Sequence, residues 1–216
     1  MKRGVILDVD GTLWDAVGVI TASWNEYRRR YIPEIPEPFR GDEVRGMLGK
    51  TMTEIRDLRL GVLPMPRRQE AMDGVMKLEV EYMYEHGGKV YPGVADTLRR
   101  LSEGGIHLYI VSNCQKGYIE DFIHATGTED IIEDHVCFGD TGRSKDFSIR
   151  LCMERNELAQ AVYVGDTQGD LDACRAAGVP FIYAAYGFGQ VDAEAEKVPR
   201  IDSFDELPAA LRKMWG

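Results

Sequence analysis

Short apolar runs alternate with helical patterns along most of the chain. The runs with the length of buried strands lie at 5–7, 106–111, 135–138, 161–164 and 181–185. Between them, from residue 94 onward, apolar residues recur every three or four positions, which is typical of helices with one buried face. Strands and helices in alternation predict parallel strands joined by right-handed crossovers. The expected fold class is α/β, with a Rossmann-like parallel sheet as its core.

The segment that follows the first strand breaks this alternation, because its pattern is helical. One helix face is formed by Ile20, Trp24, Tyr27 and Tyr31. A longer helix is expected at about 66–86, with an apolar stripe of Met72, Val75, Met76, Val80 and Met83 that Glu79 interrupts. We interpret this stripe as helix-bundle core. We therefore expect a Rossmann-like core formed by residues 1–14 and 89–216, and an inserted helical cap formed by residues 15–88 over the carboxyl ends of the strands.

Two acidic residues follow the first apolar run. Asp8 and Asp10 are one residue apart, and side chains alternate along a strand, so both are expected to start on the same face. Gly11 then ends the strand and permits close approach of a ligand to the backbone. Carboxylates at the end of a buried strand are costly unless a cation or a reaction uses them. An exposed acidic turn is the alternative interpretation of these residues alone.

Polar residues also follow the later strands. Ser112 and Asn113 come after the run 106–111, where they can donate to an anion or simply cap the next helix. Asp166 and Asp170 come after the run 161–164, four residues apart at a strand-to-helix turn. The carboxyl ends of parallel strands meet at one edge of the sheet, where these acids would repel Asp8 and Asp10. A hard divalent cation with oxygen ligands, Mg²⁺, relieves that repulsion.

A basic segment, 142–146, lies between the expected third and fourth strands. Lys145 can serve there as a point charge for a phosphate group, and Arg143 competes with it for this position. Taken alone, Lys145 is better explained as an exposed surface lysine.

These segments, in this order, resemble the motifs of the haloacid dehalogenase superfamily of phosphohydrolases. Its first motif, DxDGT after a strand, corresponds to the sequence from Asp8 to Thr12, and its second, an apolar strand ending in Ser or Thr, to Ser112. The third, a lysine at a helix start, corresponds to Lys145, and the fourth, GDxxxD, to Gly165 through Asp170. The resemblance covers the whole chain, since the helical insertion lies where phosphoglycolate phosphatase-like members carry their cap. The sequence departs from the family around Lys145, where the common Lys-Pro-x-Pro surround is absent.

The resemblance implies a mechanism and the residues that carry it. Asp8 is implied as the nucleophile that forms an aspartyl-phosphate, and Asp10 as the acid and then the base. Mg²⁺ is implied to be held by Asp8, by the backbone carbonyl of Asp10 and by Asp166. The implied phosphoryl-binding residues are Ser112, Asn113 and Lys145, with Asp170 orienting Lys145 or a metal-bound water. Lys50, in the loop 46–51 of the cap, is a candidate contact for an anionic leaving group, although a solvated lysine at a helix end explains it slightly better.

The first hypothesis is a Mg²⁺-dependent phosphatase that acts on a small phosphorylated metabolite. A sugar phosphomutase resembling β-phosphoglucomutase shares the motifs and the cap, so it stays open as an alternative. The dehalogenase and phosphonatase branches fit less well, because both typically lack an acid at the position of Asp10. The intact set of motif residues argues against a non-catalytic binding module on the same fold.

Composition narrows the partners and the setting. The formal net charge of −10 disfavours nucleic-acid binding, which needs a basic face. No apolar run approaches the ~20 residues of a membrane span, and the first strand starts too early for a signal peptide. The four cysteines form no CxxC pair, which favours a reduced, cytoplasmic setting. The oligomeric state is not predicted.

Overall fold

The structure is a computed structural model that describes residues 2–216. Within these residues, six strands form one parallel sheet in the order β5-β4-β1-β6-β7-β8. The strands are β1 (Arg3–Leu7), β4 (His107–Ser112), β5 (Ile132–Cys137), β6 (Gln160–Gly165), β7 (Phe181–Ala184) and β8 (Arg200–Ile201). β1 is central and pairs with β4 on one side and β6 on the other. The expected α/β fold with a parallel sheet is confirmed, and the ends of β4, β1 and β6 lie next to one another.

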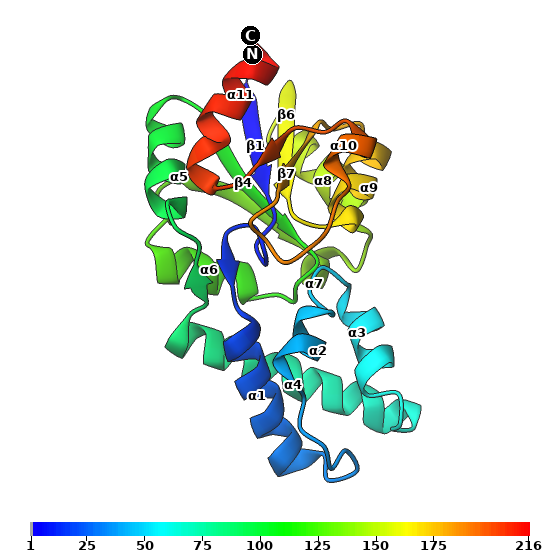
Figure 1. Cartoon of the computed structure of the whole chain (residues 1–216). Helices are drawn as coiled ribbons and strands as arrows, with labels where there is room; N and C mark the ends of the chain where they lie inside the picture. The colour runs from blue at the N-terminus through cyan, green and yellow to red at the C-terminus, as the bar shows by residue number, and fades with distance from the viewer. Residues whose placement is uncertain (1) are drawn as a thin grey trace.

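Both faces of the sheet are buried, as the apolar runs require. On β1, Val5 and Leu7 face one core cluster and Ile6 faces the other. The helices on the first face are α5 (Val94–Glu103), α6 (Tyr118–Thr126) and α11 (Leu207–Trp215). The opposite face is covered by α8 (Lys145–Arg155) and α9 (Gln168–Ala177), and Figure 1 shows the two layers on either side of the sheet.

Several short elements complete this part of the chain. They are α7 (Phe138–Thr141), α10 (Ala193–Glu196) and a 3-10 turn (Phe204–Glu206). The strand expected at 135–138 begins earlier, at Ile132, and Phe138 already belongs to α7. The early part of β5 carries polar residues because this strand lies at the edge of the sheet, so the apolar pattern detects only its buried end.

Four helices between β1 and α5 gather at the carboxyl ends of the strands, in the lower half of Figure 1. They are α1 (Val17–Tyr31), α2 (Gly41–Arg45), α3 (Met52–Arg59) and α4 (Met65–His86), and α1 packs along α4. A short antiparallel ladder, β2 (Trp14–Asp15) with β3 (Lys89–Val90), joins the two places where the chain enters and leaves this layer. The division into a core (1–14 and 89–216) and a cap (15–88) stays a prediction, and we use "cap" for these four helices.

The buried faces of the cap helices differ from the expected stripes at two positions. Ile20 and Trp24 are buried, but Tyr31, in the last turn of α1, is 51% exposed. Glu79 was expected to interrupt the buried face of α4, yet it is only 5% exposed. It is buried because Trp24 and Gln115 both donate hydrogen bonds to its carboxylate.

Among residues 2–216, no helix is both long enough and apolar enough to cross a membrane. Even α4, with its 22 residues, carries charged side chains along much of its length. The four cysteines are buried thiols that belong to the core between the sheet and its helices and loops.

Candidate active site

Asp8 and Asp10 lie at the carboxyl end of the central strand. The Asp8 N–H donates to the Val164 carbonyl of β6 at 2.9 Å, so the residue is still held by the sheet. Its side chain is almost fully buried, and that of Asp10 nearly so. Gly11 follows with a φ of +82°, and a Cβ on it would lie only 2.1 Å from an oxygen of Asp166. Glycine is therefore required for the chain to turn here against the end of β6.

Lys145 brings a positive charge to these acids from the start of α8. Its Nζ lies 3.0 Å from Asp8 Oδ1 and 2.5 Å from Asp170 Oδ1. The backbone N–H and hydroxyl of Thr167 donate to the other oxygen of Asp170, which fixes that carboxylate at the start of α9. Arg143, the competing cation, is exposed, and its guanidinium lies over the ring of Phe147. Of these two cations, the structure brings Lys145 to the acids.

Burial is the largest influence on the pKa values of Asp8, Asp10 and Asp166. It raises the pKa of Asp8 to about 6 even though Lys145 acts in the opposite direction. It raises the pKa of Asp10 to about 8 against a hydrogen bond from Tyr118 that lowers it. The pKa of Asp166 is also raised to about 8, first by burial and then by the charges of Asp170 and Asp8. Burial therefore favours the protonated forms of Asp10 and Asp166 near neutral pH, because Lys145 alone does not offset the charge of the fully ionised acids.

The same acids fit a hard divalent cation. One oxygen each of Asp8, Asp166 and Asp170 lies within 4.8 Å of the others. Asp166 Oδ2 accepts hydrogen bonds from the N–H groups of Phe188 and Gly189, at 3.1 and 2.7 Å, but Asp166 Oδ1 is buried without a hydrogen-bond partner among residues 2–216. Both Asp170 oxygens already accept protein donors. The donor set therefore suits Mg²⁺, with Asp8 and Asp166 better placed as ligands than Asp170.

A small pocket opens above Asp8 and Asp10, and the cap closes it. Ser112, at the end of β4, and Tyr118, at the start of α6, line it from the core. Met47, Lys50 and Glu79 are among the residues that line it from the cap, and its volume is about 30 Å³, close to the space of one water. The structure thus holds the site in a closed form.

Two predicted site residues lie at the border between cap and core. Asn113 Nδ2 donates to the Gly49 carbonyl at 2.8 Å, so its amide here joins the cap loop to the core. Gly49 has a φ of +86° and packs against Thr167, next to the acids. Lys50 is exposed and lines the pocket from its rim. The structure therefore places both residues beside the pocket, and their contact with a substrate stays a prediction.

The sequence reasoning missed several residues of this site. Tyr118 Oη donates to Asp10 Oδ1 at 2.7 Å, although the sequence marked Tyr118 only as part of a helix face. Glu79 and Gln115 lie in the pocket wall, joined by a hydrogen bond. A charged residue inside the apolar stripe of α4 was the available signal for Glu79. The sequence carried no comparable signal for Tyr118 or Gln115.

Comparison with known sequences agrees with these features. The family model described as haloacid dehalogenase-like hydrolase matches residues 5–184. The chain is 29% identical to a phosphoglycolate phosphatase of Cupriavidus necator, an alignment that covers 96% of this chain and 92% of that protein. It is 26% identical to a phosphoglycolate phosphatase of Salmonella choleraesuis, with 97% and 92% covered.

Solved structures share the fold. A predicted phosphoglycolate phosphatase from Haemophilus somnus superposes with a TM-score of 0.82 at 17% identity, covering 97% of this chain and 98% of that one. CbbY from Rhodobacter sphaeroides, in complex with xylulose-1,5-bisphosphate, superposes with a TM-score of 0.78 at 22% identity, covering 96% of each chain. At 17% and 22% identity, this likeness shows that the folds are alike and shows no more than that.

Proposed function

The chain belongs to the haloacid dehalogenase-like hydrolase family and is a phosphoric monoester hydrolase, and we propose that it is a Mg²⁺-dependent phosphatase acting through an aspartyl-phosphate on Asp8. The observation that carries this proposal is the placement of Asp8: it is buried and bonded to Lys145, at the pocket floor. The family membership and this placement support the same chemistry.

Asp8 suits a nucleophile because its position is fixed. Its backbone N–H donates a hydrogen bond to β6, and its Oδ1 accepts one from Lys145. The carboxylate is therefore held for in-line attack on phosphorus. In this step an Asp8 oxygen bonds to phosphorus while the bond from phosphorus to the ester oxygen breaks. Water then attacks the aspartyl-phosphate and releases inorganic phosphate with Asp8 restored.

Asp10 suits the proton transfers of both steps. It shares the pocket with Asp8, and its raised pKa keeps it protonated near neutral pH, ready to protonate the leaving oxygen. Once it has lost that proton, its carboxylate can take one from the attacking water. Tyr118 holds this carboxyl in place through a hydrogen bond at 2.7 Å.

The transferring phosphoryl group needs positive charge and hydrogen-bond donors around it. Lys145, beside Asp8, and Ser112, in the pocket wall, would supply them, and Asn113 would add a donor at the border with the cap. Asp170 positions Lys145 through a bond of 2.5 Å. Asp8, the Asp10 carbonyl and Asp166 would hold Mg²⁺, which when bound neutralises charge on the phosphoryl oxygens.

The cap excludes water from this chemistry. In the closed pocket, the Gly49 carbonyl accepts the Asn113 amide, and Lys50 lies next to it at the rim. We propose that a small phosphorylated metabolite enters when this contact opens, and that Lys50 then contacts the leaving group. Several relatives are named phosphoglycolate phosphatases, so phosphoglycolate is the first substrate to test.

The test is release of inorganic phosphate from an aryl phosphate. Purified protein should release phosphate with Mg²⁺, lose this activity in excess chelator and regain it when Mg²⁺ is restored. Asp8→Asn should abolish the activity, whereas the exposed Asp172→Asn on α9 should retain it. Full activity in excess chelator, or in the Asp8→Asn variant, would contradict the proposal.

A further inference from the structure

A buried carboxylate lies in the wall of the pocket on the side of the cap. Glu79 of α4 is 5% exposed and lines the same pocket as Asp8 and Asp10. Trp24 Nε1 donates to one of its oxygens at 2.5 Å and Gln115 Nε2 to the other at 2.7 Å. Both donors are neutral and supply no counter-charge, so burial raises the pKa of Glu79 in spite of these two hydrogen bonds. Burial of an ionisable group without a counter-charge is costly, which points to a use for it in binding.

Gln115 adds a second acceptor at the same place. Its side chain is also 5% exposed, and its Nε2 is already engaged with Glu79. Its Oε1 is buried and accepts no hydrogen bond from residues 2–216. A buried carbonyl oxygen without a partner is unfavourable, and a donor on a bound ligand would satisfy it. The pocket wall therefore offers two neighbouring acceptors, Glu79 and Gln115 Oε1.

The charges of the pocket disfavour a carboxylate on the leaving group. Asp8 and Glu79 are acidic and line one small space, and Asp10 beside them enters the reaction protonated, so none of the three offers a positive charge. Lys145 is already bonded to Asp8 and Asp170, and Lys50 lies at the exposed rim. A carboxylate beside Glu79 would meet like charge in a desolvated place, whereas a hydroxyl or ammonium group would meet acceptors.

We propose that the substrate is a phosphomonoester whose leaving group carries a hydroxyl or ammonium donor near the ester oxygen, and that Glu79 and Gln115 bind this donor. The inference rests on the proposed phosphatase function and names the substrate class of the same pocket. The preference that we propose differs from that of an enzyme selective for phosphoglycolate, because the leaving group of phosphoglycolate carries a carboxylate.

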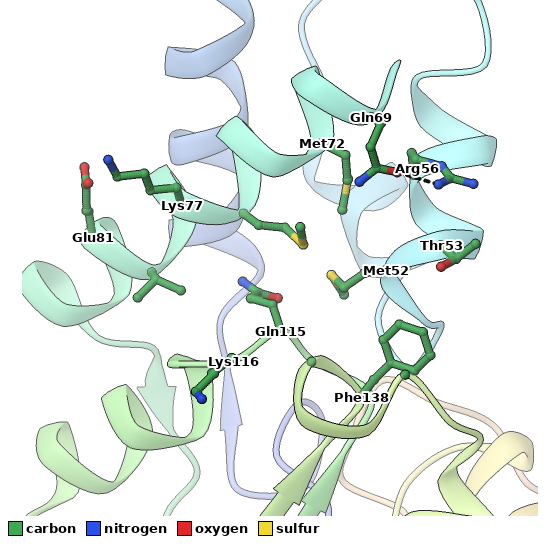
Figure 2. Close-up of a pocket in the computed structure, with 14 residues that line it drawn as sticks. Met52, Thr53, Arg56, Gln69, Met72, Lys77, Glu81, Gln115, Lys116 and Phe138 are labelled. Carbon is green, nitrogen blue, oxygen red and sulfur yellow. Dashed lines mark hydrogen bonds between the residues drawn. The ribbon is translucent and has the colours of Figure 1, made fainter. Parts of the chain in front are cut away.

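A second cavity gives the leaving group room beyond this donor. Its volume is about 710 Å³, and it lies between α3, α4 and the core segments 115–116 and 138–142. Gln115 and Met52 line both this cavity and the pocket above Asp8. Figure 2 shows Gln115 rising from the core between Lys116 and Met52, with Met72 above it. A leaving group longer than two carbons would extend toward Gln115 and Met52, the residues that the two spaces share.

The test uses three two-carbon phosphates that differ in one group: phosphoglycolate, 2-hydroxyethyl phosphate and phosphoethanolamine. With Mg²⁺, kcat/KM for at least one of the two donor-bearing esters should exceed that for phosphoglycolate by at least about tenfold. Their order shows whether the hydroxyl or the ammonium group is preferred. An equal or higher value for phosphoglycolate would overturn the inference.

Substitution of Glu79 tests the assignment. Glu79→Gln keeps the size and removes the charge, so the preference for the donor-bearing ester should fall about tenfold, mainly through its KM. A ratio of two substrates within one preparation is independent of how much protein is folded. Glu85→Gln, on the exposed end of the same helix, should keep the wild-type ratio. An unchanged ratio in Glu79→Gln would overturn the assignment.

An aryl phosphate measured in parallel distinguishes failure of the proposed phosphatase function from failure of the inference about the leaving group. If the wild-type protein with Mg²⁺ hydrolyses neither the aryl phosphate nor any ester of the series, the proposed function fails. If it hydrolyses the aryl phosphate but prefers phosphoglycolate, the phosphatase stands and only the inference about the leaving group fails.

Discussion

Tyr118 Oη donates a hydrogen bond of 2.7 Å to Asp10 Oδ1, and both side chains are buried. Tyr118 begins α6, and its ring packs edge-on against Trp14, so the hydroxyl has a fixed direction. The bond stabilises the charged form of Asp10 and so opposes the effect of burial on its pKa. Tyr118 thus sets both the position and the proton affinity of the proposed acid and base.

Tyr118→Phe should therefore raise the pKa of Asp10 further, because burial remains and the opposing hydrogen bond is lost. Asp10 must be deprotonated to activate water, so the rising limb of kcat against pH should move to higher pH. A shift of up to about one unit corresponds to ~1.4 kcal/mol, the size of one hydrogen bond to a charged group. The measurement is a pH-rate profile with an aryl phosphate whose leaving group needs no proton.

The matched control is Tyr109→Phe. Tyr109 is also buried, but its hydroxyl donates to Glu133. Its profile should coincide with that of the wild-type protein. If the Tyr118→Phe profile also coincides, then Asp10 is not the base that limits the reaction.

Lys145 is expected to be essential for the chemistry and Arg143 dispensable. Lys145→Met keeps the aliphatic stem but removes the charge beside Asp8, so turnover of every phosphate ester should fall by ~10³-fold, by analogy with arginine fingers. Arg143→Met should retain activity within about threefold, because the exposed Arg143 lies over Phe147. Circular dichroism checks that both variants fold. Greater loss in Arg143→Met than in Lys145→Met would reverse the assignment.

Asp166 is expected to lower the stability of the metal-free protein. Its pKa rises from 3.8 to about 8 on folding, so the folded state binds the proton more tightly than the unfolded state. The contribution of this group to stability is then present at low pH and is lost as the pH rises from about 4 to about 8. Asp166→Asn should raise the melting temperature at pH 8 in the presence of chelator, and the gain should shrink as the pH is lowered.

Mg²⁺ should reverse this order. The ion binds the folded state, so the wild-type melting temperature should rise with Mg²⁺ concentration, by an amount that corresponds to about 2.7 kcal/mol at a hundred times its Kd. Asp166→Asn should lose most of this rise, whereas the exposed Asp172→Asn should keep it. An equal Mg²⁺-dependent rise in Asp166→Asn would remove Asp166 from the proposed ligands.

The strand-end acids could be predicted from the sequence because their signals are local. An apolar run followed by Asp8 and Asp10 predicts a buried strand with acids at its end, and parallel strands bring Asp166 to the same edge. The order of the motifs also singled out Lys145, and the structure places it between Asp8 and Asp170. These residues lie far apart in sequence but at adjacent strand or helix ends, which the alternating pattern determines.

The rest of the site depends on contacts without a local pattern. Glu79 is buried because Trp24 and Gln115, distant along the chain, converge on its carboxylate. The helical spacing places Glu79 within the apolar stripe of α4, but it does not show which side chains would bind a carboxylate there. The N–H groups of Phe188 and Gly189 that hold Asp166 are backbone atoms, and their positions leave no mark in side-chain chemistry.

The covalent intermediate on Asp8 is the central claim, and mass spectrometry of a trapped phosphoenzyme tests it most directly. Asp10→Asn keeps the proposed nucleophile but removes the base, so an activated aryl phosphate should still phosphorylate the protein and hydrolysis should then be slow. After rapid quench, the account predicts one added phosphoryl group on the peptide that contains Asp8, and none in Asp8→Asn. A label on Ser112, or turnover by the wild-type protein without any label on Asp8, would contradict the account.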